Sequence, residues 1–231
     1  MDRTIAKQVL AWPEVRRIMT IPGMGATASA GVMAAIGDIR RFPTPRHLVA
    51  YLGLDARVRQ SGSAPARHGG ISKQGSAEAR HLLVEAAWAA VSTPGPLRAF
   101  GERIRARRGA NIATVAVARK LAILCWHLLT REEDYAFARP SLVREKIRLL
   151  ELAAGAPNRN GYRNLVRVFA TPAQRRLERE VGAQAEKAYR RFVKDFQATG
   201  NKGAGAITGA RMSVPPKGQA PRQEQAPDPA L

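Results

Sequence analysis

Apolar residues at helical spacing run through the first 154 residues of the chain, and this pattern narrows the possible folds more than any other feature. The strongest predicted helix covers residues 111–129, where four large side chains recur every three or four positions: Val117, Leu121, Leu124 and Leu128. A second helix, predicted at 76–92, carries Leu83 and small residues that would let the two helices approach closely. Only residues 56–59 have a weak strand pattern. We therefore predict a mostly α, compact helical domain.

Residues typical of helix starts mark several of the predicted boundaries. Ser76 and Asn111 are placed to cap the two helices just described, and Thr44 precedes a proline at a first helical position. Thr171 and Gln174 have the spacing of a capping box ahead of a helix that ends near residue 199.

The charge of the chain indicates a polyanionic partner. Its 231 residues include 38 Lys and Arg against 18 Asp and Glu, a formal net charge of +20. Self-repulsion of this size opposes folding unless a polyanion offsets it, and nucleic acid is a more common partner than an anionic membrane surface. No uncharged apolar run approaches the roughly 18 residues that span a bilayer, so we expect no membrane association and a cytoplasmic location. The single Cys125 excludes a disulfide framework.

A turn with two glycines gives the first candidate site. Gly23 and Gly25 lie between two predicted helices and could form a sharp helix-hairpin-helix turn. The free N–H groups at the start of the second helix could then bind a nucleic-acid phosphate. A tight helical turn without a ligand explains the same residues equally well.

A long basic, glycine-rich loop from residue 54 to 75 gives the second candidate. Long loops without regular structure are uncommon in compact domains and are often functional. Cations in and beside it could bind phosphates: Arg57, Arg59, Arg67, Lys73 and Arg80. The residues alone favour a loop that only holds a nucleic-acid backbone over one that reacts with it. They do not rank the serines in the loop and at its end, Ser61, Ser63, Ser72 and Ser76. Arg105 and Arg108 belong to a further basic cluster, either a solvated face or a phosphate contact.

Several ordered motifs resemble one family of bacterial insertion-sequence transposases. They are Ile21-Pro-Gly-Met-Gly25, Leu48 to Leu54, Ser61-Gly62, Ile71-Ser-Lys-Gln-Gly75, Ala79 to Leu83 and Ala116 to Leu121. In sequence and order they are similar to the carboxy-terminal transposase domain of the IS110/IS116/IS902 family, over about residues 4–136. The resemblance implies the end of a coiled-coil linker at 1–20, a transposase domain at 21–136 and a helical extension at 137–199. Residues 200–231, rich in Gly, Pro, Ala and Gln, are predicted to be a disordered tail.

The family's chemistry would be carried here by Ser61. Family members use a serine in a Ser-Gly pair to attack DNA, and Ser61-Gly62 matches that pair. With Ser61 in this role, we expect Arg57 and Arg59 to flank the attacked phosphate and Gly62 to let the backbone approach closely. The resemblance also implies a structured non-coding RNA as a second partner and a dimer or tetramer.

The sequence departs from the family pattern in one respect. Full-length members carry an amino-terminal RuvC-like domain with four acidic metal ligands, and no set of Asp and Glu here could replace them. We expect no metal or other cofactor in this chain, and Mg²⁺ only together with the RuvC-like domain. We therefore expect a truncated transposase that binds DNA but is inactive alone. The alternative is a non-catalytic, basic nucleic-acid-binding relic.

Overall fold

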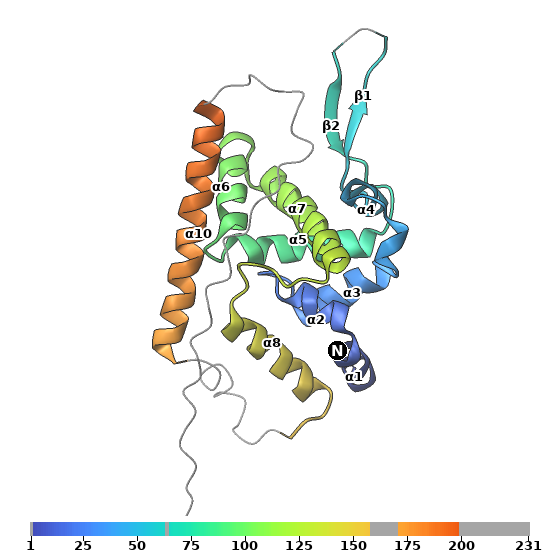
Figure 1. Ribbon diagram of the computed structural model, residues 1–231. Helices are drawn as coiled ribbons and strands as arrows, with labels where there is room; N and C mark the ends of the chain where they lie inside the picture. Colours follow the sequence, from blue (N-terminus) through green and yellow to red (C-terminus); the bar gives the residue numbers. More distant parts are fainter. Residues whose placement is uncertain (1, 63–64, 158–170, 199–231) are drawn as a thin grey trace, which may run out of the picture. The chain divides into compact units, whose positions relative to one another are not determined.

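The computed structural model describes residues 2–62, 65–157 and 171–198. The predicted disordered tail after residue 200 and Ser63 lie outside these ranges. The described chain up to Val193 belongs to one compact unit, and the packing below concerns that unit. Its structure is mostly helical, as predicted (Figure 1).

The helices and strands follow each other in a simple order. They are α1 (Arg3–Ala11), α2 (Pro13–Met19), α3 (Ala26–Ile36), the 3-10 turn η1 (Ile39–Arg41), α4 (Pro45–Tyr51), β1 (Ala56–Arg59), β2 (Arg67–Ile71), α5 (Ala77–Val91), α6 (Pro96–Arg108), α7 (Ala110–Arg131), α8 (Pro140–Ala153) and α10 (Pro172–Ala198).

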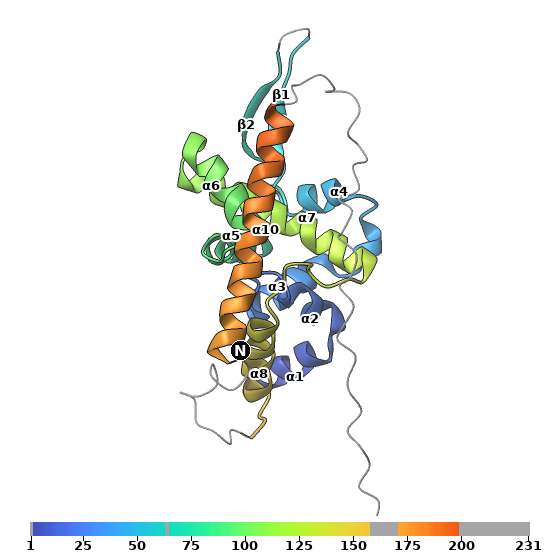
Figure 2. The same ribbon diagram turned by 60° about the vertical axis from the view of Figure 1, so that its left-hand side comes forward.

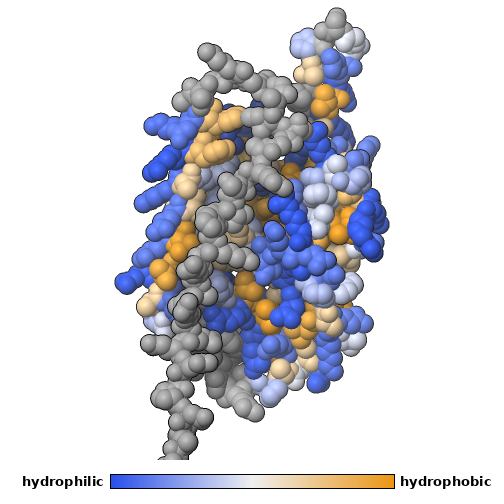
Figure 3. All heavy atoms as spheres, viewed as in Figure 1, coloured by the Kyte–Doolittle hydropathy of each residue, from blue (hydrophilic) through white to orange (hydrophobic). Residues whose placement is uncertain are grey.

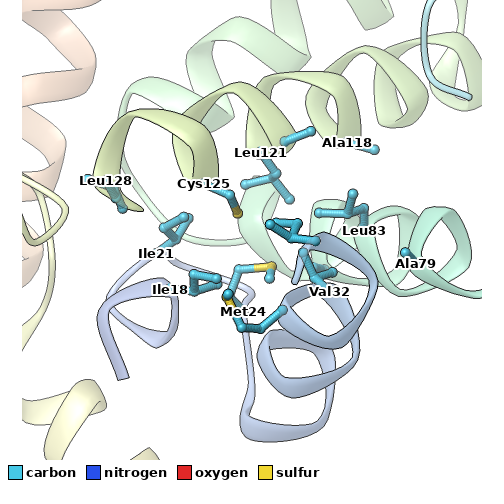
Figure 4. Packing of buried hydrophobic residues seen from close by; sticks show 14 of the residues in the cluster. Ile18, Ile21, Met24, Val32, Ala79, Leu83, Ala118, Leu121, Cys125 and Leu128 are labelled. Carbon is cyan, nitrogen blue, oxygen red and sulfur yellow. The ribbon is translucent and has the colours of Figure 1, made fainter. Parts of the chain in front are cut away.

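The long helix α7 is the centre of the packing and contacts α2, α4, α5 and α6. Figure 4 shows Leu121 and Cys125 of α7 facing Ile21 and Met24 from the region of the first turn. By length and composition α7 could cross a membrane, but half of its apolar stretch is buried in the protein, as in a core helix. The predicted packing of α5 on α7 is confirmed, although Leu124 is only half-buried.

The capping predictions are mostly confirmed. Ser76 Oγ accepts the N–H of Ala79 at 3.2 Å, and Thr171 and Gln174 exchange the two hydrogen bonds of a capping box. Asn111 is not a cap. Gly109 (φ 84°) makes the sharp turn between α6 and α7, so Asn111 already lies in the first turn of α7.

Most of the predicted loop at 54–75 is instead a β-hairpin, and the weak strand pattern at 56–59 coincides with its first strand, β1. Strands β1 and β2 pair antiparallel, with Val58 opposite His68 and an irregularity near Ala56. The hairpin extends away from the helices in both views (Figures 1 and 2). Its composition hid it, because Gly and Arg are weak strand formers and β1 is exposed on both faces. The irregular register also breaks the alternation that identifies strands.

Helix α10 is attached to the core through its carboxylates. Glu186, 5% exposed, accepts the N–H of Gly95 at 3.1 Å and hydrogen bonds from Arg98 and Arg190. Burial raises the pKa of Glu186, but the hydrogen bonds from the two arginines and Gly95 outweigh it and leave the pKa below its usual value. Glu178 accepts hydrogen bonds from the backbone N–H and hydroxyl of Ser141 at the start of α8. These contacts are polar and are expected to weaken in salt where they are exposed.

Candidate functional site

Hydrogen bonds among Asp55, Arg57 and Ser72 join the two strands of the hairpin at the end nearest the helices, which we call the neck. Ser72, 7% exposed, donates its hydroxyl to the carboxylate of Asp55 and its N–H to the backbone carbonyl of Asp55 at 2.8 Å. Arg57 Nη2 in turn donates to the carbonyl of Ser72 at 2.8 Å. Because the Ser72 hydroxyl is buried and occupied, its role here is to hold the neck.

Backbone contacts anchor this neck to the end of α4. The N–H of Lys73 donates to the carbonyl of Gly53 at 3.1 Å, and Arg80 Nη1 donates to Leu52 O at 3.2 Å. Gly75 has φ 120°, and a Cβ there would lie 1.9 Å from Tyr51 O. The predicted phosphate ligand Arg80 is thus half-buried and bound to a backbone carbonyl, whereas Lys73 remains exposed.

Ser61 lies at the far end of the hairpin. Both Ser61 and Gly62 are exposed, Gly62 has φ 56°, and open space surrounds the position of a Cβ there. Of the serines that the sequence left unranked, Ser72 is buried and Ser76 caps α5, so Ser61 is the exposed one within the described residues. In that part of the chain no hydrogen bond joins its hydroxyl to a carboxylate or an imidazole.

A basic groove of about 890 Å³ lies between the neck of the hairpin and the α6–α7 junction. Its lining residues are Leu54, Ala56, Arg57, Gly69, Gly70, Ile71, Lys73, Arg108, Asn111, Ile112, Val115, Ala116 and Arg119. It brings together three of the predicted phosphate ligands, Arg57, Lys73 and Arg108, from segments up to 51 residues apart in sequence. The face drawn in Figure 3 is largely hydrophilic, with smaller hydrophobic patches.

Sequence reasoning missed Arg119 as a site residue. It lies on α7 at helical spacing from Ile112, Val115 and Ala116, which also line the basic groove. That spacing was visible in the sequence. The spacing indicates a site only in combination with the hairpin, whose residues line the other side of the basic groove.

The other predicted ligands lie elsewhere. Arg59 is exposed on β1 and Arg105 on the last turn of α6, and neither lines the basic groove. Arg67 begins β2, and its side chain lies outside what the structure describes. Gly25 caps α3 with an extended backbone and no steric need for glycine. Gly23 has φ 86°, and a Cβ there would lie 2.1 Å from Ala86 O, so close packing on α5 explains this glycine.

Lys146 of α8 holds the turn between α2 and α3, a contact that the sequence did not suggest. Its ammonium donates to the carbonyls of Met19, Ile21 and Met24 at 2.7, 3.1 and 2.9 Å. Burial lowers the pKa of Lys146 from 10.5 to about 8. The turn for which a helix-hairpin-helix was predicted is therefore held by a partly buried cation.

Acidic, histidine and cysteine side chains do not gather into clusters of three among the described residues. Within residues 2–62, 65–157 and 171–198, no three His, Cys, Asp or Glu side chains lie close enough together to bind a metal ion. Cys125 is fully buried, and burial raises the pKa of its thiol to about 12, so it serves as a core residue.

The chain is similar in sequence to several known proteins. Residues 15–102 match the transposase family described as IS116/IS110/IS902. A probable family 20 transposase of Pseudomonas aeruginosa is 35% identical over 140 residues, which cover 58% of this chain and 41% of that protein. The transposase for insertion sequence element IS1111A of Coxiella burnetii is 36% identical over 126 residues, or 53% of this chain and 34% of that protein.

A third relative is named for a different rearrangement of DNA. The pilin gene-inverting protein of Moraxella bovis is 32% identical over 87 residues, covering 36% of this chain and 27% of that protein. The matched region spans less than half the length of each of these relatives. It contains α5, the hairpin and the neck that holds it. Residues 15–102 of this chain therefore match the transposase family described as IS116/IS110/IS902, and two of the similar proteins are named as transposases.

Proposed function

We propose that the chain acts in transposition of an insertion sequence and that Ser61 is its nucleophile. The supporting observation is the exposed Ser61-Gly62 pair at the tip of a hairpin whose neck is fixed by buried hydrogen bonds. The Ser61 oxygen would form a bond to a DNA phosphorus, and the bond from that phosphorus to a deoxyribose oxygen would break. The departing strand would end in a hydroxyl. The phosphoserine ester would conserve the free energy of the broken phosphodiester bond, so that a DNA hydroxyl could later displace the serine and rejoin the strand.

The reaction needs an acceptor for the proton of Ser61 and a donor that protonates the departing deoxyribose oxygen. A serine hydroxyl is a weak nucleophile until a base or metal activates it. We propose that carboxylates of a RuvC-like domain, with Mg²⁺, supply this activation. Groups that act as one unit are strongly non-additive, so the 231-residue chain alone is expected to bind DNA without cleaving it.

DNA is the proposed substrate and a structured RNA a second partner. The net charge of +20 and the cations of the basic groove support binding to phosphates. Arg59 and Arg105 would add contacts beyond the groove, and the start of α3 at Gly25 would add a backbone contact. We further propose that the protein works as a cytoplasmic dimer or tetramer, which light scattering with and without DNA would measure.

The decisive experiment is a covalent trapping assay. The chain is mixed with the RuvC-like domain of a full-length relative, its RNA, Mg²⁺ and end-labelled DNA, and the protein is resolved under denaturing conditions. A labelled adduct is expected with the wild type and with Ser63→Ala, and none with Ser61→Ala. An adduct that survives Ser61→Ala would refute the nucleophile assignment.

Binding to DNA is tested separately by its dependence on salt. If about six phosphates are contacted, affinity should fall about a thousandfold between 50 and 200 mM salt. Arg105→Glu with Arg108→Glu should weaken binding while the circular dichroism spectrum is unchanged. Affinity that stays flat across this range would exclude the electrostatic account.

A non-catalytic nucleic-acid-binding protein is the second candidate. It is favoured by the net charge of +20 and the cations of the basic groove, which account for binding to phosphates without any chemical step. Salt-sensitive binding without any adduct in the reconstituted mixture would select it.

A further inference from the structure

The basic groove combines two surfaces that a duplex backbone would not use together. Arg57, Lys73, Arg108 and Arg119 supply positive charge, and none of the described lining residues is acidic. The remaining lining is mostly aliphatic, and Ile112 on it is 52% exposed. Phosphates would use the cations, but they gain nothing from an aliphatic floor, which would stay in contact with water.

Two glycines of β2 keep one wall of this groove free of side chains. A Cβ on Gly70 would meet nothing within 4 Å, and a Cβ on Gly69 would make only ordinary contacts of 3.7 Å with Arg57. Neither glycine has a positive φ. Backbone geometry and local packing therefore do not require glycine here, and glycine weakens a strand. The two glycines lie opposite Arg57, where the register of the hairpin is irregular, and glycine in a strand marks either such a bulge or a place where a ligand approaches the backbone closely.

We propose that the basic groove binds unpaired nucleotides, with base faces on the aliphatic floor and against Gly69–Gly70 and with phosphates at the four cations. This inference rests on the proposed binding of nucleic acid and specifies its form. In a duplex the base faces are stacked on each other, so they cannot cover the floor. In an unpaired strand the base faces are free, and covering the aliphatic floor with them would remove apolar surface from water in addition to making the phosphate contacts.

The charge of the basic groove favours a nucleotide strand over a peptide as its ligand. A peptide could cover the aliphatic floor, but four cations without a described carboxylate require a polyanion. A nucleotide strand carries one phosphate for each base and so matches the cations and the floor at once.

The test compares single-stranded and duplex DNA of one sequence by fluorescence anisotropy at fixed salt, using the full chain. The wild type is expected to bind the single strand more tightly. Gly70→Leu, which fills the groove, should weaken single-strand binding about tenfold or more and duplex binding by less than about threefold. Ala66→Leu, in the same hairpin outside the groove, is the matched control and should leave both affinities unchanged.

A second variant keeps the test independent of strand folding. Ile112 is exposed on a long helix, so Ile112→Ser should leave the circular dichroism spectrum unchanged and reduce the single-strand preference alone. The inference would be overturned if these variants lost affinity for single-stranded and duplex DNA equally. It would also be overturned if neither Gly70→Leu nor Ile112→Ser lost affinity for single-stranded DNA. If the wild type binds duplex at low salt but does not prefer single strands, only this inference fails. Binding to neither form would also remove the proposed function.

Discussion

Replacing Lys146 by Met removes a buried ammonium while keeping most of the side-chain volume. In the wild type this ammonium donates to three carbonyls of the α2–α3 turn, yet burial lowers its pKa from 10.5 to about 8. A base whose pKa is lowered by folding binds more protons in the unfolded state. Between about pH 8 and 10.5 the free energy of unfolding of the wild type therefore rises with pH.

The size of this effect follows from the two pKa values. With 10.5 in the unfolded chain and about 8 in the folded one, the rise between about pH 7 and pH 10 is about 2.5 kcal/mol. Other groups titrate over the same range, so the informative quantity is the stability of the wild type minus that of Lys146→Met. That difference should grow by about 2.5 kcal/mol, because the variant lacks the titrating group.

Urea unfolding followed by circular dichroism at the two pH values measures the difference directly. The matched control is Lys7→Met, which removes an exposed lysine and should show no such growth. The three carbonyls could instead stabilise the ammonium enough to cancel the effect of burial on its pKa. The stability of the wild type minus that of Lys146→Met would then change by less than about 0.5 kcal/mol between the two pH values, and this result would refute the account of a destabilised cation.

Three further predictions concern the core and the neck. Gly75→Ala, whose Cβ would lie 1.9 Å from Tyr51 O, should lower the free energy of unfolding in urea by about 3 kcal/mol or more. Gly109→Ala, with φ 84° but open space, should lower it by about 1–2 kcal/mol, and equal losses would contradict the steric argument. Cys125 should resist a thiol reagent until the protein unfolds, and rapid labelling of the native protein would show that it is not buried. Leu121→Ala should cost about 2–5 kcal/mol in thermal unfolding and the half-buried Leu124→Ala clearly less, a ranking that the reverse order would disprove.

Local signals allowed much of the helical structure to be predicted. Ser76 and the Thr171–Gln174 capping box were identifiable because a cap involves residues only two or three positions apart. Asn111 failed as a cap because Gly109, two residues earlier, already makes the turn. Residue type alone does not show which of two adjacent helix-start signals the chain uses.

The site was harder to predict because its contacts join distant residues. Arg57 was expected at a phosphate, but its partnership with Ser72 depends on the pairing of two strands whose composition disguises them. Lys146 reaches a turn more than 120 residues earlier, and no periodic pattern encodes such a contact. Ser61 was selected by resemblance to the family, and its exposure at the hairpin tip adds an observation independent of that resemblance.

A two-stranded ribbon fixed at one end behaves mechanically as a short cantilever. Ser61 is five positions beyond Ala56 at the neck, a reach of about 15 Å for extended chain. A rotation of only about 10° at the neck would therefore move the Ser61 hydroxyl by about 2–3 Å, nearly the whole distance between reacting atoms in a productive complex. If Ser61 is the nucleophile proposed above, the stiffness of the Asp55–Ser72 contact would set how often Ser61 is aligned with its target, and loosening this contact should reduce the rate of reaction far more than the affinity for DNA.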